Sequence, residues 1–460
     1  MSKEITHLHD IQNRFFKSGN TLSVKSRMQG LKKLKKQLSL HSTQIEEALA
    51  KDLGKSASES FLSEIGMVFS EINYFLRNTK KLSKPKAVKS SWINYPSNDY
   101  IVPEPYGVTL HIAPWNYPFQ LSLTPLVGAV AAGNTVVLKP SEQAPHTAQC
   151  IEDIITKCFP NEWVAVVKGG PETAKSLLDL RWDYIIYTGG TTVAKVVALA
   201  AAKHLTPTTL ELGGKNPCVV DHTAKAHVSA RRIVFGKFLN CGQTCIAPDY
   251  ILVHESKKDE LINALITAIK KSYTNQPQTS PDYGKIVNQK HFKRLIQLLK
   301  NQDLIYGGQS DIKNLYISPT LVSVNELPNS LMEEEIFGPI LPILVYNSDV
   351  ELQNIINKFE KPLSFYVFSQ RKRWAKKIMH HFSFGGGVIN DTLIQFTNRR
   401  LPFGGVGHSG MGSYHGKHSF DTFSHKKPYI HRTTWLDPKI RYAPYGKNIN
   451  LLKPLLKWLS

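Results

Sequence analysis

A short β-rich run passes through two glycines into a helical pattern in the stretch Tyr184-Ile185-Ile186-Tyr187-Thr188-Gly189-Gly190-Thr191-Thr192-Val193-Ala194-Lys195. Glycine in such a turn lets backbone N–H groups approach a phosphate at the positive end of the following helix. The spacing falls short of the full G-x-G-x-x-G pattern, so the stretch alone is as typical of a tight connection as of a nucleotide site. It does predict one strand–turn–helix unit of a parallel sheet.

The same alternation of strand and helix recurs along the chain. Further β-rich runs stand at residues 108–112, 134–140, 164–167, 217–220, 250–253, 341–346 and 363–368. Helical patterns stand at residues 21–82, 147–158, 258–271 and 289–300. Strands that alternate with helices predict an α/β fold, here a Rossmann-like, doubly wound domain followed by a second α/β domain.

Composition narrows the class of protein. A chain of 460 residues is too long for one ordinary core, and 42% hydrophobic with 20% charged residues is typical of a globular protein. Five cysteines without a C-x-x-C pair favour a reducing, cytoplasmic compartment. No signal peptide pattern opens the chain, and proline and glycine interrupt the uncharged residues 105–138, so we expect a buried strand–loop–helix–strand passage rather than a membrane span.

The charge balance is strongly basic, with 57 Lys and Arg against 36 Asp and Glu, a net charge of +21. Such a charge attracts phosphates, anionic lipids or nucleic acid. No zinc-finger spacing or RNA-binding aromatic motif is present, so we expect neither nucleic-acid binding nor a metal site. The tail, residues 447–460, mixes leucine, lysine and tryptophan. A packed or solvated terminus is the default interpretation, and peripheral contact with an anionic membrane at the inner face of the cell membrane is the alternative that this composition suits.

Two residues point to acyl chemistry. Cys245 ends the stretch Asn240-Cys241-Gly242-Gln243-Thr244-Cys245, and Glu211 opens Glu211-Leu212-Gly213-Gly214-Lys215. A thiolate adds to a carbonyl, and a carboxylate activates the water that releases the acyl product.

Two expectations concern the state of the thiol. A helix N-terminus, a nearby cationic ring or a general base would each favour the ionisation of Cys245. Cys241 and Cys245, four positions apart, could share one helical face and form a disulfide under oxidation. The remaining cysteines read as inert, small hydrophobic residues.

With these residues in place, the chain resembles the NAD(P)-dependent aldehyde dehydrogenases from about residue 51 to residue 428. The resemblance is carried by Pro114-Trp115-Asn116-Tyr117-Pro118, by Glu335-Ile336-Phe337-Gly338-Pro339, by Pro402-Phe403-Gly404-Gly405-Val406-Gly407 and by Tyr414-His415-Gly416-Lys417-His418. The last two are similar to the dimeric class III and fatty aldehyde branch. The resemblance implies a homodimer that oxidises an aldehyde to its acid through a thiohemiacetal on Cys245 and a thioester hydrolysed by water that Glu211 activates. It also implies that the amide of Asn116 and the backbone N–H of Cys245 donate to the oxyanion, a role that suits asparagine because its amide donates without titrating.

The resemblance also implies a cofactor site, with Lys139 at the adenosine ribose, Glu142 near its 2′-hydroxyl, Glu335 at the nicotinamide ribose and Phe337 against the nicotinamide. The implied cofactor residues are Trp115, Lys139, Glu142, Gly189, Gly190, Leu212, Gly213, Glu335 and Phe337. A carboxylate beside the 2′-hydroxyl disfavours a 2′-phosphate, which indicates NAD. NADP stays open, because relatives with the same Lys–Glu pair accept it.

The substrate is expected to be an apolar aldehyde, of the long-chain aliphatic, polyene or aromatic kind. Residues expected to line its passage are Tyr117, Thr244, Phe396, Thr397 and His415. His415 is read either as reaching the substrate mouth or as a structural histidine with its hydrogen bonds satisfied. Arg399 and Arg400 are interpreted as pairing across a domain contact, with steering of an acidic substrate as the alternative.

The chain divides into four expected parts. The cofactor domain takes residues 1–83 and 102–211, and the catalytic domain takes residues 212–400. Residues 84–101 and 420–446 are expected to form bridging segments that serve oligomerisation, as the resemblance implies. Residues 447–460 form the amphipathic basic tail.

Three rival functions remain. In a CoA-acylating dehydrogenase, CoA rather than water releases the thioester, and Glu211 would waste that intermediate. A silent scaffold that serves as a structural or membrane-associated protein would not need every catalytic position filled. A cysteine hydrolase lacks a histidine that a motif assigns to Cys245.

Overall fold

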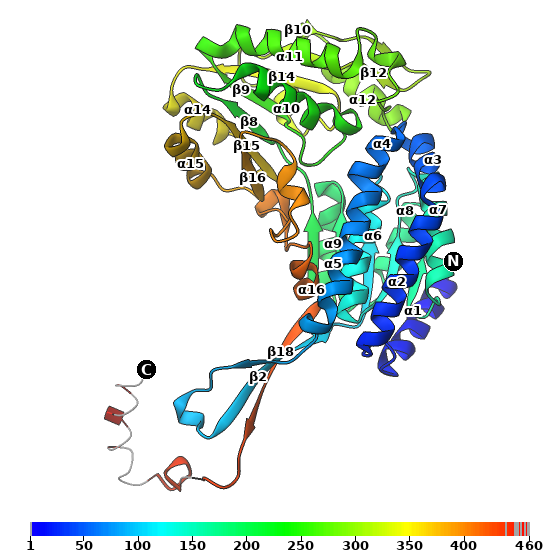
Figure 1. Ribbon diagram of the computed structural model, residues 1–460, viewed down its shortest axis with the longest axis vertical. Coiled ribbons are helices and arrows are strands. Elements are labelled where there is room, and N and C mark those ends of the chain that lie inside the picture. The colour runs from blue at the N-terminus through cyan, green and yellow to red at the C-terminus, as the bar shows by residue number, and fades with distance from the viewer. Residues whose placement is uncertain (1, 438, 446–449, 451–452, 455–456, 458–460) are drawn as a thin grey trace.

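The structure is a computed structural model that describes residues 2–437, 439–445, 450, 453, 454 and 457. Two α/β bodies make up most of the molecule, and a slender arm of antiparallel strands leaves one of them (Figure 1). The amphipathic tail predicted at residues 447–460 lies, apart from a few single residues, outside this described part of the chain.

The first body is built on a six-stranded sheet. In spatial order its strands are β17 (Gly410–Met411), β7 (Thr208–Glu211), β6 (Tyr184–Thr188), β3 (Val108–Ile112), β4 (Thr135–Lys139) and β5 (Val164–Val166). All neighbours are parallel except β17, which is antiparallel to β7. Four of these strands confirm the predicted runs. Buried residues fill β3, β4 and β6 almost without interruption, as expected of a sheet covered on both faces.

Helices cover this sheet. They are α1 (Ser2–Lys17), α2 (Val24–Leu40), α3 (Ser42–Leu53), α4 (Ala57–Ser60), the π-helix η1 (Phe61–Ile65), α5 (Gly66–Leu82), α6 (Gln120–Ala132), α7 (Pro145–Cys158), α8 (Pro171–Leu178) and α9 (Thr191–Ala202). Every residue of α6 is buried, which confirms the buried passage predicted at residues 105–138. Among the residues that the structure describes, no helix has both the length and the apolar character needed to cross a membrane.

The second body contains a seven-stranded sheet. Its strands, in spatial order, are β10 (Asp303–Tyr306), β13 (Thr320–Ser323), β14 (Ile340–Tyr346), β9 (Tyr250–His254), β8 (Pro217–Val220), β15 (Ser364–Phe368) and β16 (Gly386–Ile389). Its helices are α10 (Ala226–Phe238), α11 (Lys258–Tyr273), α12 (Gln289–Leu299), α13 (Ser330–Glu333), α14 (Asp349–Ile356) and α15 (Lys372–His381). Only β10 runs antiparallel to its neighbour, so the predicted parallel character is confirmed here too.

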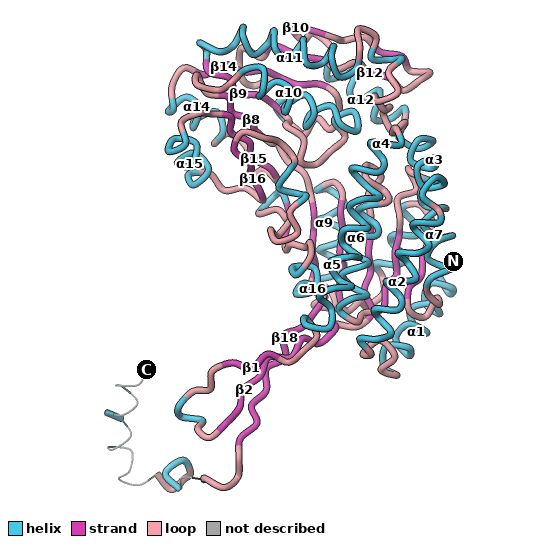
Figure 2. The backbone as a smooth tube through the Cα atoms, in the orientation of Figure 1, coloured by secondary structure: helices cyan, strands magenta, loops and turns pink. Residues whose placement is uncertain are grey.

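The arm is a three-stranded antiparallel sheet of β1 (Lys86–Val88), β2 (Ser97–Pro105) and β18 (Ser424–Arg432) (Figure 2). Strands β2 and β18 pair along nine residues, from Pro105 opposite Ser424 to Ser97 opposite Arg432. The segments predicted to bridge subunits therefore lie side by side. Large apolar side chains are exposed on and beyond the arm, including Tyr95 and Trp435, which is 70% exposed.

Candidate active site

A cleft of about 560 Å³ receives residues from both bodies. Its lining includes the segments that follow β3, β6 and β7 at their carboxyl ends, where open α/β sheets bind ligands. The sequence-predicted residues in the lining are Trp115, Asn116, Gly189, Gly190, Glu211, Leu212, Gly213, Cys245, Glu335 and Phe337. The structure thus brings the predicted thiol, carboxylate and amide into one cleft with the glycine turns.

The turn between β6 and α9 offers an anion site. Helix α9 begins at Thr191 with Gly190 at its N-cap, and its first turn carries no acidic side chain. The N–H groups of this turn therefore present positive charge to the cleft that Gly190 and Thr191 line. A Cβ on Gly190 would meet no atom within 4 Å, so space for a ligand lies over the turn.

Gly213 shows how closely the two bodies approach at the cleft. A Cβ at this position would lie 2.0 Å from Oε2 of Glu335, so any side chain would displace that carboxylate. Together with the open helix end, these features fit the pyrophosphate and ribose of a nicotinamide dinucleotide. When bound, that group supplies the acceptor for the hydride of an aldehyde.

Glu211 is the last residue of β7 and is only 1% exposed. Within the described residues, neither carboxyl oxygen has a hydrogen-bond partner. Burial raises the pKa of Glu211 well above its usual range. A buried carboxyl without partners beside a cleft is costly for structure alone, and it suits a group that accepts a proton from a bound reactant.

Cys245 lies on a turn, so of the three factors that would favour its ionisation the structure does not supply a helix N-terminus. Burial, then the nearby carboxylates of Glu335 and Glu211, raise the pKa of the thiol. Its ionisation therefore depends on positive charge brought into the cleft. The Nδ2 of Asn216 donates to the carbonyl oxygens of Cys245, at 2.7 Å, and Ala247, at 2.9 Å, which fixes the turn.

Cys241 and Cys245 do not share a helical face, in contrast to the prediction. The short helix η3 (Leu239–Gly242) is interrupted, because Asn240 and Cys241 adopt left-handed conformations with φ of 53° and 52°. Cys241 is buried, whereas Cys245 is partly exposed to the cleft. The two thiols thus occupy different environments.

Asn116 is buried, and its Nδ2 donates to the carbonyl oxygen of Gln243 at 3.1 Å. A primary amide has two N–H bonds, so the second one can serve the oxyanion of an adduct on Cys245. Asn116 and Cys245 lie in the same lining, as this role requires.

Glu335 and Phe337 follow α13. Burial raises the pKa of Glu335 to about 8. The loop is fixed by Asp249, whose Oδ1 accepts from the N–H of Ile336 at 3.0 Å and whose Oδ2 pairs with Lys215 at 2.5 Å. The ring of Phe337 packs edge-on against Trp115, with centroids 5.3 Å apart, so both predicted aromatic residues frame the same part of the cleft.

Lys139 and Glu142 lie at the carboxyl end of β4 and are not among the residues that line the cleft. Lys139 Nζ donates to Glu142 Oε2 at 2.8 Å. Although partial burial acts to raise the pKa of Glu142, the hydrogen bond from Lys139 lowers it. Glu142 is therefore held as a carboxylate next to β3, whose last residue, Ile112, pairs with Lys139.

The predicted substrate residues fall into two groups. Tyr117 and Thr244 are buried and joined by a hydrogen bond between their hydroxyl oxygens, 2.7 Å apart. Phe396 packs against the ring of His415 with centroids 4.5 Å apart, while Thr397 is exposed. An apolar cluster of Ile246, Leu363, Leu393, Phe403 and Tyr414 has Cys245 packed against it. The thiol therefore faces an apolar wall.

His415 does not match the alternative of a structural histidine with satisfied hydrogen bonds. Its ring is 1% exposed and stacks on Phe403, and neither ring nitrogen has a partner in the described part of the chain. Burial lowers the pKa of His415 to about 3. A neutral imidazole with free nitrogens thus lies in the aromatic wall.

Arg399 confirms the predicted contact between distant segments. It pairs with Glu71 of α5, and it donates to Ser70 Oγ at 2.6 Å and to the Met67 carbonyl oxygen at 2.5 Å. Arg400 is exposed.

Some residues that shape the site were missed. Asn216 holds the Cys245 turn, Lys215 and Asp249 hold the Glu335 loop, and Lys55 reaches the carbonyl of Asn116. A sequence signal existed only for Lys215 and Asn216, which directly follow the predicted carboxylate and glycines.

Comparison with known proteins identifies the family. The model of the aldehyde dehydrogenase family matches residues 2–428. The chain is 46% identical over 445 residues to 4,4'-diaponeurosporen-aldehyde dehydrogenase of Staphylococcus aureus (strain NCTC 8325 / PS 47), which covers 96% of this chain and 97% of that protein. It is 43% identical over 435 residues to aldehyde dehydrogenase family 3 member A2 of Rattus norvegicus, covering 94% and 90%.

The fold agrees with these relatives. The substrate-bound state of Staphylococcus aureus AldH matches with a TM-score of 0.97 at 45% identity, covering 98% of this chain and 99% of that one. More distant solved structures that match were determined with NAD+ or with NADP. The chain therefore belongs to the aldehyde dehydrogenase family, and it oxidises an aldehyde to the carboxylic acid with NAD or NADP.

Proposed function

We propose that the chain oxidises a long, apolar aldehyde through a thioester on Cys245, with Glu211 as the base that activates water and Asn116 as the oxyanion donor. The observation that supports this proposal most directly is the shared cleft, which Cys245, Glu211 and Asn116 line together with the open end of α9. The Cys245 sulfur adds to the carbonyl, the Asn116 amide stabilises the oxyanion, and Glu211 later takes a proton from water.

The test of this site is the variant Cys245→Ala. We expect it to lose NADH formation from any aldehyde while it binds NADH as the parent protein does, because the thiol forms the covalent bond but does not hold the dinucleotide. Binding is measured by NADH fluorescence and turnover by absorbance of the reduced nicotinamide. Full turnover by the Cys245→Ala protein would contradict the proposal.

The apolar wall against Cys245 supports a long aliphatic, polyene or aromatic aldehyde over one that carries a second carboxylate. The name of the Staphylococcus aureus relative points to a polyene aldehyde, in agreement with this wall. We expect kcat/KM to be higher for decanal, benzaldehyde and a polyene aldehyde than for succinic semialdehyde. A preference for the semialdehyde would overturn the substrate class.

Release of the thioester by CoA is the second candidate. The buried Glu211 argues against it, because a base beside the thioester promotes hydrolysis. We therefore expect NADH formation to be independent of added CoA. A strict requirement for CoA would reverse the assignment, and no NADH from any aldehyde would favour a silent scaffold.

The arm supports a homodimer. Its exposed apolar side chains, among them Trp92, Ile93 and Tyr95, are typical of a surface that another copy covers. The pairing of β2 (Ser97–Pro105) with β18 (Ser424–Arg432) supports joint use of the segments 84–101 and 420–446, to which these strands contribute, as a bridge. Light scattering should give twice the 51.7 kDa of one chain. A monomer at micromolar concentration would contradict this proposal.

The net charge of +21 supports peripheral contact between a cytoplasmic enzyme and an anionic membrane. The tail, residues 447–460, is the segment that we propose to make this contact. Co-sedimentation with anionic vesicles should fall when these residues are deleted. Equal sedimentation of the full chain and the truncated chain would place the membrane-binding surface outside the tail. If neither sediments with the vesicles, the proposal fails.

A further inference from the structure

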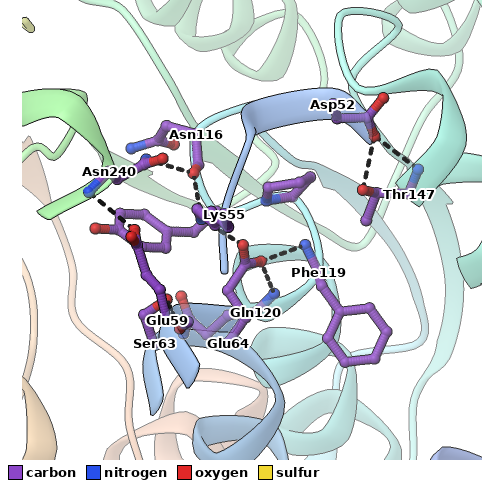
Figure 3. A network of polar contacts seen from close by, with 12 residues as sticks. Asp52, Lys55, Glu59, Ser63, Glu64, Asn116, Phe119, Gln120, Thr147 and Asn240 are labelled. Atoms are coloured by element: carbon purple, nitrogen blue, oxygen red, sulfur yellow. Dashed lines mark hydrogen bonds and ion pairs between the residues drawn. The ribbon is translucent and has the colours of Figure 1, made fainter. Parts of the chain in front are cut away.

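A buried ion pair lies behind the segment that carries Asn116 (Figure 3). Lys55 and Glu64 are both fully buried, and Lys55 Nζ lies 2.5 Å from Glu64 Oε1. The other carboxyl oxygen of Glu64 accepts from the backbone N–H groups of Phe119, at 2.8 Å, and Gln120, at 3.1 Å, at the start of α6. The pair therefore binds the segment just after Asn116.

The same lysine also binds Asn116 itself. Lys55 Nζ donates to the carbonyl oxygen of Asn116 at 3.0 Å and lies 4.0 Å from the ring centroid of Tyr117. Segment 116–120 is thus held from its first carbonyl to its last amide by one ion pair. The side-chain amide of Asn116 is held separately, because its Nδ2 donates to the carbonyl oxygen of Gln243 at 3.1 Å, so both backbone and side chain have fixed partners.

A second link ties this segment to the loop that leads to Cys245. Asn240 Nδ2 donates to the carbonyl oxygen of Asn116 at 2.8 Å and to that of Gln243 at 3.1 Å, and Glu59 Oε1 accepts from the backbone N–H of Asn240 at 2.9 Å. Asn240 has a left-handed backbone with φ of 53°, a conformation that carries an energetic cost in residues other than glycine. The Glu59 carboxylate and the Asn116 carbonyl oppose that cost.

We propose that Lys55 is a positioning residue, which, with Glu64 and Glu59, sets the distance between the Asn116 amide and the loop that carries Cys245. The inference rests on the proposed role of Asn116 as the oxyanion donor. Lys55 does not line the cleft and acts through the carbonyl of Asn116. The carbonyl joins both halves of the site, because it accepts from Lys55 on one side and from Asn240 on the other.

Stability alone does not account for this pair. Replacing a buried ion pair by neutral groups of similar volume is often neutral or stabilising, whereas removing one partner destabilises strongly. A structural role and a positioning role therefore predict different results for a single and a double substitution.

The test compares Lys55→Met with the double variant Lys55→Met/Glu64→Gln. The single variant leaves a buried carboxylate unpaired, so we expect a lower Tm and kcat reduced at least tenfold. The double variant keeps an oxygen for the N–H groups of Phe119 and Gln120, so we expect Tm to return toward the parent value while kcat stays at least tenfold low. Recovery of kcat together with Tm would overturn the proposal, as would a kcat within threefold of the parent in the double variant. If the single variant does not fold, the kcat of the double variant alone tests the proposal.

A second readout separates oxyanion stabilisation from cofactor binding. Hydrolysis of 4-nitrophenyl acetate needs a thiol and an oxyanion donor but no dinucleotide, so we expect it to fall by the same factor as aldehyde oxidation in the double variant. The Kd for NADH should stay within twofold. A loss of aldehyde oxidation without a loss of ester hydrolysis would contradict the positioning role. So would a Kd for NADH that rises by the same factor by which kcat falls.

Asp52 supplies the matched control. It is buried three residues from Lys55 and accepts from the N–H and hydroxyl of Thr147, at 2.8 and 2.7 Å, at the start of α7 (Figure 3). Asp52→Ala should lower Tm and leave kcat within threefold. Asn116→Ala separates the two proposals. If this variant keeps full activity, the proposed role of Asn116 in the reaction fails. If it loses activity and the Lys55 variants do not, only the positioning role of Lys55 fails.

Discussion

Two buried glutamates, Glu64 and Glu211, differ in the partners of their carboxyl oxygens. Glu64 is fully buried and has partners on both oxygens, a lysine on one and two backbone amides on the other. Glu211 is equally buried, but within the described structure neither of its oxygens has a partner. This difference agrees with the proposed roles, in which Glu64 holds the site and Glu211 reacts in it.

The cost of each arrangement agrees with this division. A partnered carboxylate keeps its charge and fixes its neighbours, whereas burial without partners favours the neutral acid. Glu211 has therefore been placed where a proton is easily accepted from water that enters with the substrate. The following predictions test the contrast, from the largest expected effect to the smallest.

Glu211→Gln should lower kcat roughly 10² to 10³-fold, because an amide cannot take a proton from the hydrolytic water. The first turnover should still release one equivalent of NADH, since the thioester forms before the base is needed. Stopped-flow absorbance measures both. Loss of the first turnover as well would place Glu211 earlier in the reaction.

The pH dependence of the parent enzyme gives the control for that variant. Because burial raises the pKa of Glu211 well above its usual range, thioester hydrolysis should accelerate as the pH rises through that raised pKa and deprotonates the base. The variant should lack this rise. The same rise in both proteins would assign the titration to another group.

Arg399→Ala should destabilise the fold by about 3 kcal/mol, because it leaves Glu71 buried without its cation. Urea unfolding measures the loss. Arg400→Ala, at the exposed neighbouring position, is the control and should change the free energy of unfolding by less than about 0.5 kcal/mol. Equal effects at both positions would mean that the Glu71 pair does not stabilise the fold.

Glu59→Gln tests a partnered acid whose ionisation is nevertheless costly. Burial raises the pKa of Glu59 from 4.5 to about 7, so the folded protein binds more protons than the unfolded chain between these values. Its stability contribution is therefore largest below pH 4.5 and is lost as the pH rises through 7, by about 3 kcal/mol.

The Glu59→Gln variant keeps an acceptor for the N–H of Asn240 and should lack this part of the pH dependence. Urea unfolding at several pH values compares it with the parent. Glu47→Gln, at an exposed position of α3, is the control and should follow the parent curve. Parallel curves for the parent and Glu59→Gln would contradict the assignment.

Glu142 is intermediate between Glu64 and Glu211, since it has one charged partner, Lys139, and its side chain is 40% exposed. Glu142→Gln should lower the preference for NAD over NADP about tenfold, because one negative charge near the proposed 2′-hydroxyl position is removed. The ratio of kcat/KM for the two cofactors measures it. Glu172→Gln, in a surface pair, is the control. An unchanged ratio would separate Glu142 from the ribose site.

The sequence predicts the parallel sheets well, because apolar strand runs and glycine turns are local signals. β3, β4 and β6 form where residues 108–112, 134–140 and 184–187 indicate strands. Local signals fail where long-range contacts decide the structure. Strand β17 has two residues and is defined by its antiparallel pairing with β7, about which its own short sequence carries no signal.

The same limit applies to the site. Cys245, Glu211 and Asn116 stand in recognisable motifs, and the structure places all three in one cleft. In the stretch Lys51-Asp52-Leu53-Gly54-Lys55, the sequence pattern does not distinguish Lys55 from a solvent-exposed lysine. Its partners, Glu64 and the carbonyl oxygen of Asn116, are brought to it by the fold. The turn at Cys245 was missed because left-handed backbone at Asn240 and Cys241 follows from tertiary contacts rather than from residue type.

The edge of the first sheet joins segments that lie far apart in the sequence. Glu211 is paired with Gly410, and the N–H of Leu212 donates to the carbonyl oxygen of Ser409, so a much later segment borders the end of β7. A folding chain in which the thiol and the glycine turn are already in place still lacks this border. Docking of segment 409–411 on β7 is therefore a long-range step that the complete site requires.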